Sequence, residues 1–248
     1  MRNIDHNLEF LRNCSNTELQ KLCDFLTFDS NGKYRISEQL TETDAYYRNY
    51  PDNMQGMTGE IAEELLKFGS NSIVTYFREG RPDSYEDVVR RVCKKMKVKV
   101  AITDNAVDME HKLLQDVCET AINNMTPEEL NALADEIGLA KKNINKQMMI
   151  SALMLAMKRY PQVFGRVVTY VVTRVLAFLA GRAAAATGAK VLQRIFGVAT
   201  GPVGWMAMTA WTVWDIAAPA YRVIVPAVLN VAVLRFTHTP LLAYGRVA

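Results

Sequence analysis

The chain has 248 residues, of which 50% are hydrophobic and 22% are charged. This length fits one large domain or two small ones, and the composition excludes a disordered or collagen-like protein. The overall net charge of +3 conceals an uneven distribution. Residues 1–136 hold 16 Lys and Arg against 25 Asp and Glu, a net charge of −9, whereas residues 137–248 hold 13 against one, a net charge of +12. An acidic module joined to a cationic, apolar module is therefore predicted, and the second is suited to anionic lipid or nucleic acid.

The cysteine pattern and the N-terminus indicate a cytosolic protein. No C-x-x-C spacing occurs among the four cysteines, which are Cys14, Cys23, Cys93 and Cys118. The N-terminus lacks the basic and apolar regions of a cleaved secretion signal. We expect reduced thiols in the cytoplasm.

Short helices are predicted along the first 125 residues. Ser15 and Glu18 have the spacing of a capping box, so a pair of helices should begin the fold. Residues 40–50, followed by Pro51, form a polar and aromatic-rich stretch that we interpret as a connection. The remaining helices of this region are predicted at residues 58–68, 72–77, 85–96 and 105–124.

A domain boundary is predicted near residue 126. Thr126, Pro127 and Glu129 supply a cap residue, a proline at the first helical position and a carboxylate in the first turn. The helix that starts here should pair with another at about residues 143–159. We expect an acidic helical domain at 1–125, a connecting helical hairpin at 126–160 and a hydrophobic, cationic, membrane-associating region at 161–248.

The third region contains a stretch that could reach across a bilayer. Residues 195–214 carry no charge, and 20 residues of helix span about 30 Å, the thickness of a bilayer core. The sequence Gly201-Pro202-Val203-Gly204 would break this helix, so a hydrophobic helical hairpin is predicted. Tryptophans near the tip are typical of the membrane interface. The residues expected to insert are Gly197, Gly201, Pro202, Gly204, Trp205, Trp211 and Trp214.

Two further features of this region favour close packing in an apolar environment. Small residues recur every four positions, a spacing that lets two helices approach closely and supports self-association. These residues are Ala177, Gly181, Ala185 and Ala189. Asp215 precedes Arg222 by seven residues, and an ion pair between them would lower the cost of burying both charges. The competing interpretation is a buried core, because the central helices of a bundle are also apolar on all sides.

No pattern in the chain predicts an enzyme. The G-x-S-x-G, P-loop, dinucleotide-binding and H-E-x-x-H motifs are all missing. Asp104, Asp108 and His111 share a helix spacing found in metal sites, but a solvated acidic helix face is the simpler interpretation. We expect no cofactor and no metal.

A basic stretch precedes residue 100. Its charged residues are Arg90, Arg91, Lys94, Lys95, Lys97 and Lys99. A solvated helix face, a membrane surface contact and nucleic-acid binding all fit this arrangement. No aromatic residues are interleaved for base stacking, so nucleic acid is the weakest partner of the three.

Several segments, spread in order over nearly the whole chain, resemble the YaaW-like family of bacterial proteins. They are Leu8-Glu9-Phe10-Leu11, Cys14-Ser15, Asn31-Gly32-Lys33, Ile61-Ala62-Glu63-Glu64-Leu65, Phe68-Gly69-Ser70-Asn71-Ser72-Ile73, Lys94-Lys95-Met96-Lys97-Val98-Lys99, Gly201-Pro202-Val203-Gly204 and residues 221–229. The family has no assigned activity, so no catalytic residue is implied. Its middle region is weakly similar to the ubiquinol–cytochrome c chaperone domain, a helical assembly factor. The chain departs from the family pattern in a longer, more apolar segment at 163–220.

Together these patterns predict an all-α protein with an N-terminal bundle of short helices and one or two C-terminal hydrophobic helical hairpins. The expected function is non-enzymatic association with the anionic inner membrane of a bacterium from the cytoplasm, extending to membrane perturbation or pore formation. The alternative is a soluble interaction or assembly-chaperone module that binds a client helix.

Overall fold

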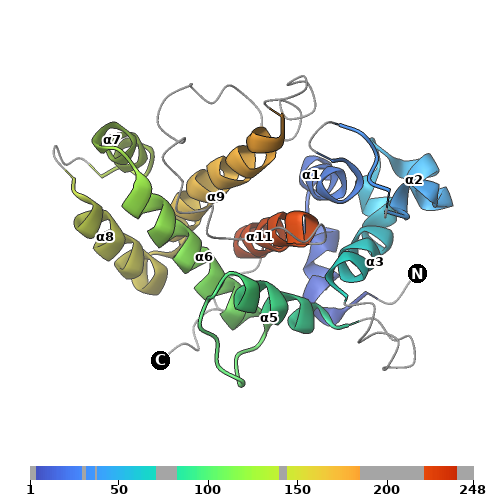
Figure 1. The fold of residues 1–248 in the computed structure, drawn as a ribbon, viewed down its shortest axis with the longest axis horizontal. Coiled ribbons are helices and arrows are strands. Elements are labelled where there is room, and N and C mark those ends of the chain that lie inside the picture. The colour runs from blue at the N-terminus through green and yellow to red at the C-terminus, as the bar shows by residue number, and fades with distance from the viewer. Residues whose placement is uncertain are drawn as a thin grey trace.

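The computed structural model describes residues 4–29, 32–36, 38–70, 83–139, 144–184 and 221–238, without the side chains of 158, 161 and 175–184. Within these ranges the chain folds into helices (Figure 1), accompanied by an isolated β-bridge between Phe28 and Tyr34. The all-α fold class predicted from the sequence is confirmed.

Short helices build the first 70 residues. They are η1 (His6–Asn13), α1 (Asn16–Thr27), η2 (Leu40–Glu42), α2 (Asp44–Asn49), η3 (Met54–Met57) and α3 (Thr58–Gly69), where η marks a 3₁₀ helix. The predicted pair at the N-terminus is η1 followed by α1. The interpretation of residues 40–50 as a connection was wrong, since Thr43 accepts a hydrogen bond from the Tyr46 amide and caps α2.

Longer helices follow. They are α5 (Tyr85–Lys95), α6 (Ala106–Asn124), α7 (Pro127–Glu136), α8 (Lys146–Arg159), α9 (Pro161–Ala184) and α11 (Tyr221–His238). The predicted helix starts near 85, 105 and 126 are confirmed to within one residue. The helix predicted at 72–77 lies outside the described residues.

Side-chain caps explain why these starts were predictable. Capping boxes pair Ser15 with Glu18, Ser84 with Asp87, Asn105 with Asp108 and Thr126 with Glu129. In each box the cap side chain accepts from the third helical amide, and the third residue accepts from the cap amide. Both groups would otherwise lack partners at a helix N-terminus.

Replacing Ser84 with Ala should lower the free energy of unfolding by about 1 kcal/mol, because the Asp87 amide loses its acceptor at the start of α5. Urea denaturation of the purified protein measures this change. Ser151 is an exposed residue inside α8 and provides the control. Its replacement by Ala should leave stability unchanged or slightly higher, since Ala is the better helix former. Equal effects of the two substitutions would contradict the role of the cap.

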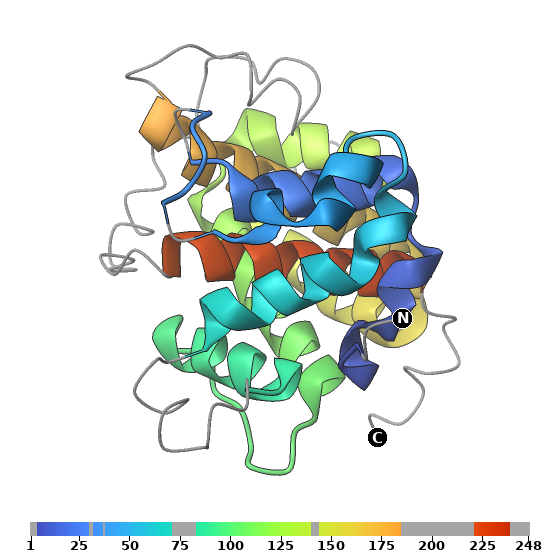
Figure 2. The same ribbon diagram turned by 90° about the vertical axis from the view of Figure 1, so that its right-hand side faces the viewer.

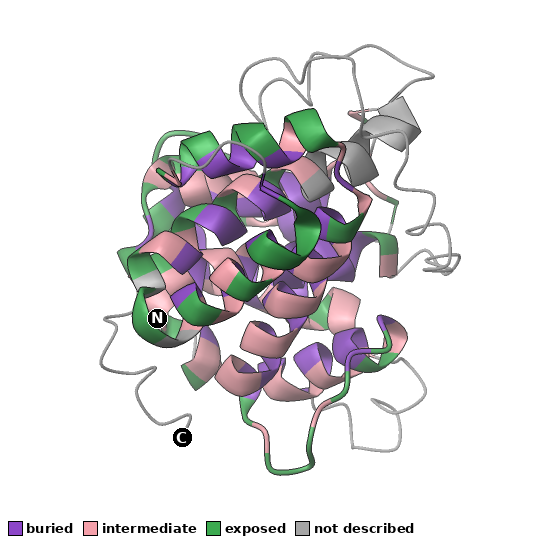
Figure 3. Ribbon diagram, turned by 90° about the vertical axis from the view of Figure 1, so that its left-hand side faces the viewer, coloured by how far each residue is buried: buried purple, intermediate pink, exposed green. Residues whose placement is uncertain are grey.

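Helix α11 lies at the centre of the bundle. It contacts η1, α1, α3, α5, α6 and α9 (Figure 1), and in Figure 2 α1 and α3 lie on either side of it. Residues 223–229 are all buried, and Figure 3 shows buried positions on the inner sides of the surrounding helices. A helix enclosed on every side has no polar face to present to water. This explains why 221–234 is apolar apart from Arg222 and Asn230.

The described parts of the predicted third region join the core of the first. Phe164, Val168 and Val172 of α9 lie in one hydrophobic cluster with residues of η1, α1, α3, α5, α6 and α11. The division into domains at 125 and 160 stays a prediction. The predicted hairpin tip lies in 185–220, outside the described residues. Among the helices that the structure describes, none is both long and apolar enough to cross a membrane.

Candidate functional site at the end of the last helix

The last turn of α11 carries Arg235 and His238, three positions apart and therefore on one side of the helix. Each of these side chains meets an acidic partner from an early segment of the chain. Arg235 reaches Glu110 of α6, and His238 reaches Glu18 of α1. Charged side chains from three helices therefore meet at the end of the central helix.

Arg235 forms a buried, two-pronged ion pair with Glu110. Its Nε lies 2.6 Å from Glu110 Oε2 and its Nη2 lies 3.2 Å from Oε1. The same Nη2 donates to the Asn7 carbonyl at 2.6 Å, and the Tyr85 hydroxyl donates to Glu110 Oε1 at 2.7 Å. The side chains of Arg235 and Glu110 are only 8% and 1% exposed. Such a pair gives little stability over apolar residues. It links α11 to α6 and to the Asn7 carbonyl.

Aromatic rings complete the surroundings of this pair. The Arg235 guanidinium lies 4.4 Å from the centroid of the Phe10 ring and 5.9 Å from that of Tyr85. The electron-rich ring faces stabilise the cation. The pKa of Glu110 is raised, because burial outweighs the charge of Arg235 and the hydrogen bonds from Arg235 and Tyr85, which act to lower it. The arrangement holds a carboxylate in place inside the protein and offers it no contact with solvent.

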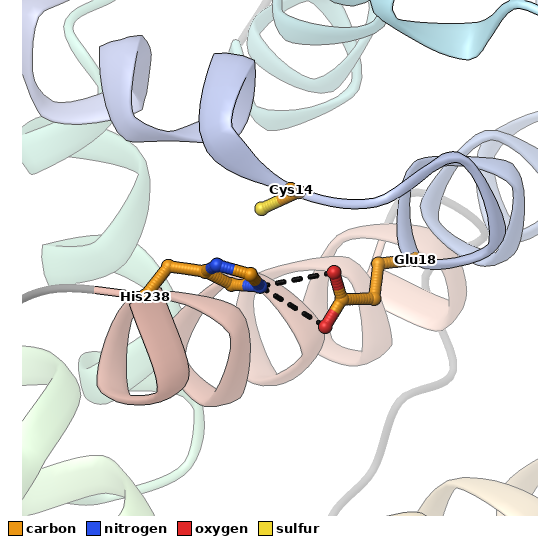
Figure 4. Close-up of side chains that lie close together, drawn as sticks. All are labelled: Cys14, Glu18 and His238. Carbon is orange, nitrogen blue, oxygen red and sulfur yellow. Dashed lines mark hydrogen bonds and ion pairs between the residues drawn. The ribbon is translucent and has the colours of Figure 1, made fainter.

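His238 and Glu18 form a second cluster with Cys14 (Figure 4). The Nε2 atom of His238 lies 3.0 Å from Glu18 Oε1 and 2.9 Å from Oε2. One nitrogen, one carboxylate oxygen and the Cys14 sulfur all lie within 4.8 Å of one another. No other group of three potential metal ligands occurs in the part of the chain that the structure describes.

The cluster lies at the edge of the core. Cys14 is buried, whereas the side chains of His238 and Glu18 are 22% and 29% exposed. Burial, helped by the charge of Glu18, raises the pKa of the Cys14 thiol to about 12. Burial also acts to raise the pKa of Glu18, but hydrogen bonds from His238 and Ser15 outweigh it and the pKa is lowered. The cluster thus combines an acceptor that is charged at neutral pH with a neutral thiol.

The structure places few of the residues that the sequence singled out. Ala177 and Gly181 belong to α9, but their side chains are outside the described residues. Arg222 lies on α11 and is exposed. The other predicted site residues also fall outside the described ranges: Ala185, Ala189, Gly197, Gly201, Pro202, Gly204, Trp205, Trp211, Trp214 and Asp215. Membrane insertion and the Asp215–Arg222 pair therefore stay predictions.

Asp104, Asp108 and His111 make contacts that support the fold. Asp104 pairs with Lys112, and Asp108 completes the capping box of α6. His111 is half-buried beside the Phe236 ring, and burial lowers its pKa. The three side chains do not form a group of metal ligands in the structure.

Three residues of the basic stretch make internal contacts, and one of them is Lys95, whose Nζ lies 5.3 Å from the centroid of the Tyr221 ring. Arg90 donates to the carbonyls of Ala101 and Asp104, at 2.9 and 2.7 Å, and so holds the loop before α6. Arg91 donates to the Gly69 carbonyl and pairs with Asp83 at 2.7 Å. Lys94, Lys97 and Lys99 remain exposed.

Comparison with known proteins identifies the family. A protein described as a UPF0174 protein from Helicobacter pylori strain J99 is 33% identical over 232 residues, which cover 93% of this chain and 91% of the relative. The chain belongs to the UPF0174 family. The UPF0174 protein YaaW of Escherichia coli K12 is 27% identical and covers 93% of the chain and 94% of its own length. The resemblance to the YaaW-like family is thereby confirmed.

A narrower match covers the N-terminal segment of this UPF0174 protein. A family model described as a domain of unknown function, DUF3944, matches residues 3–36. This segment contains η1, α1, Cys14 and Glu18. No solved structure matches the chain.

Proposed function

We propose that this UPF0174 protein is a non-enzymatic, cytoplasmic protein that associates with the anionic inner membrane through residues 185–220. The helical bundle acts as the folded body, and the apolar segment between α9 and α11 acts as the membrane contact. Self-association of the inserted segments extends this function to membrane perturbation.

One observation carries the proposal. Both helices that flank 185–220 belong to the core, because residues of α9 and α11 share one hydrophobic cluster. The segment between them contains the 20 uncharged residues 195–214 with their three tryptophans. Since α11 already uses its apolar surface inside the bundle, an apolar segment of this length needs another water-free environment.

The charge distribution supports an anionic surface as that environment. Residues 137–248 carry 13 basic side chains and one acidic one. Arg182, Lys190 and Arg194 precede the uncharged stretch, where they would meet lipid headgroups when the stretch inserts. Each basic residue near an anionic membrane contributes about 1 kcal/mol of attraction.

Vesicle binding tests the proposal. The full chain should sediment with vesicles of phosphatidylethanolamine and phosphatidylglycerol. Met208→Asp should lower the inserted population by a factor of roughly 100, because a carboxylate costs about 2.5 to 3.5 kcal/mol at the bilayer centre. Met208→Leu is the matched control and should bind like the wild type. Release of a trapped dye from the same vesicles measures membrane perturbation.

The alternative, an interaction module that binds a client helix, gives a different result. Full-length protein would then stay in the supernatant with vesicles of any composition. Equal sedimentation of wild type and the Met208→Asp variant would likewise refute insertion of 195–214. Replacing 185–220 with a Gly-Ser linker of equal length provides a further control, since this variant should keep its helical circular dichroism and lose vesicle binding.

A further inference from the structure

We propose that Cys14, Glu18 and His238 form a Zn²⁺ site that ties the end of the last helix to the start of α1. The three side chains come from three separate places: the residue after η1, the first turn of α1 and the last residue of α11. Figure 4 shows them converging. This inference does not depend on membrane binding.

The ligand chemistry fits zinc. Thiolate sulfur, imidazole nitrogen and carboxylate oxygen are its usual protein ligands, at about 2.3, 2.0 to 2.1 and 2.0 to 2.2 Å. Tetrahedral geometry with these bond lengths separates the ligand atoms by about 3.4 to 3.6 Å. In the structure His238 Nε2 and Glu18 Oε1 are 3.0 Å apart, and one nitrogen, one carboxylate oxygen and the sulfur all lie within 4.8 Å of one another. Side-chain rotations that move these atoms by about 1 Å would therefore form the site.

Charge neutrality favours a divalent cation at this depth. On binding, the Cys14 thiol proton leaves to solvent and a sulfur–zinc bond forms in its place. One thiolate and one carboxylate then balance the two positive charges, so no net charge is placed beside the core. The neighbouring Arg235 adds no net charge, because the Glu110 carboxylate neutralises its guanidinium.

Ser15 would orient the carboxylate ligand. Its backbone amide and hydroxyl donate to Glu18 Oε2, at 2.8 and 2.7 Å. These bonds persist when Glu18 binds the metal through Oε1, which lies 3.0 Å from His238. A hydrogen-bonded partner behind a ligand is typical of metal sites. The side chains of His238 and Glu18 are 22% and 29% exposed, so water could supply the fourth ligand.

Zinc titration of untagged, full-length protein tests the site. After removal of bound metal with a chelator, the protein is titrated with Zn²⁺ in competition with a chromophoric chelator. We expect one Zn²⁺ per chain. Replacing a residue that only hydrogen-bonds a metal ligand typically weakens metal affinity by roughly 10- to 100-fold. Cys14→Ala and His238→Gln each remove a ligand and should weaken Zn²⁺ binding by more than this. Zn²⁺ should also raise the melting temperature of the wild type but not of these variants.

Matched controls separate metal binding from folding. Cys23→Ala removes another buried thiol of the same region, and His6→Gln removes an exposed imidazole. Both variants should bind Zn²⁺ like the wild type. Substitution with Co²⁺ in the unmutated protein should give a near-ultraviolet absorption band from thiolate ligation. Because this measurement uses the wild-type protein, its result does not depend on whether a variant folds.

Three results would overturn the inference. The first is a wild-type chain that competes for no Zn²⁺. The second is a Cys14→Ala or His238→Gln variant that binds Zn²⁺ as tightly as the wild type. The third is a Co²⁺ complex without the thiolate band, which would show that the metal is bound elsewhere.

Discussion

Replacing Arg235 with Met should lower the free energy of unfolding by about 3 to 5 kcal/mol, the usual consequence of removing one partner from a buried ion pair. The substitution keeps most of the apolar volume of the side chain but leaves the Glu110 carboxylate without its cation. It also leaves the Asn7 carbonyl without its donor. Denaturation by urea, followed by circular dichroism, measures the change.

Two variants show whether the effect comes from the unpaired charge. Arg166→Met removes an exposed arginine from α9 and should change stability by about 0.5 kcal/mol or less. Adding Glu110→Gln to Arg235→Met removes the buried charge while keeping an acceptor for the Tyr85 hydroxyl, so a large part of the lost stability should return. If Arg166→Met and Arg235→Met were equally mild, the buried ion pair would not be the source of the lost stability.

Local signals in the sequence predicted most of the helix starts. Ser15 and Thr126 were identified because a cap acts on amides only three residues away. Helix α2 was missed because it is short and its sequence is polar and aromatic-rich. Its position depends on burial of Tyr46, which is a tertiary contact.

The partners across the bundle had no such local signal. Arg235 and Glu110 lie 125 residues apart in the chain, and His238 and Glu18 lie 220 residues apart. A single sequence contains nothing that links residues at these separations. The one hint was physical: an arginine at the end of an apolar helix requires an acidic partner.

The apolar character of 221–234 posed a different difficulty. The interior of a bundle and the core of a bilayer both exclude water, so both select helices without polar faces. Composition alone therefore assigned α11 and the uncharged stretch 195–214 to one membrane-associating region. In the structure α11 is enclosed by helices of the bundle.

The role of α11 as the core of the folded body can be tested at Leu229. This side chain is fully buried near the middle of the helix, and Leu229→Ala should lower the free energy of unfolding by about 2 to 5 kcal/mol through lost burial and the remaining cavity. Leu155 of α8 is 51% exposed, and Leu155→Ala should cost far less. Vesicle binding by folded Leu229→Ala protein should match the wild type, because the proposed membrane contact lies at 195–214. A variant with unchanged stability and weakened vesicle binding would instead assign α11 to the membrane contact and leave the bundle without its central helix.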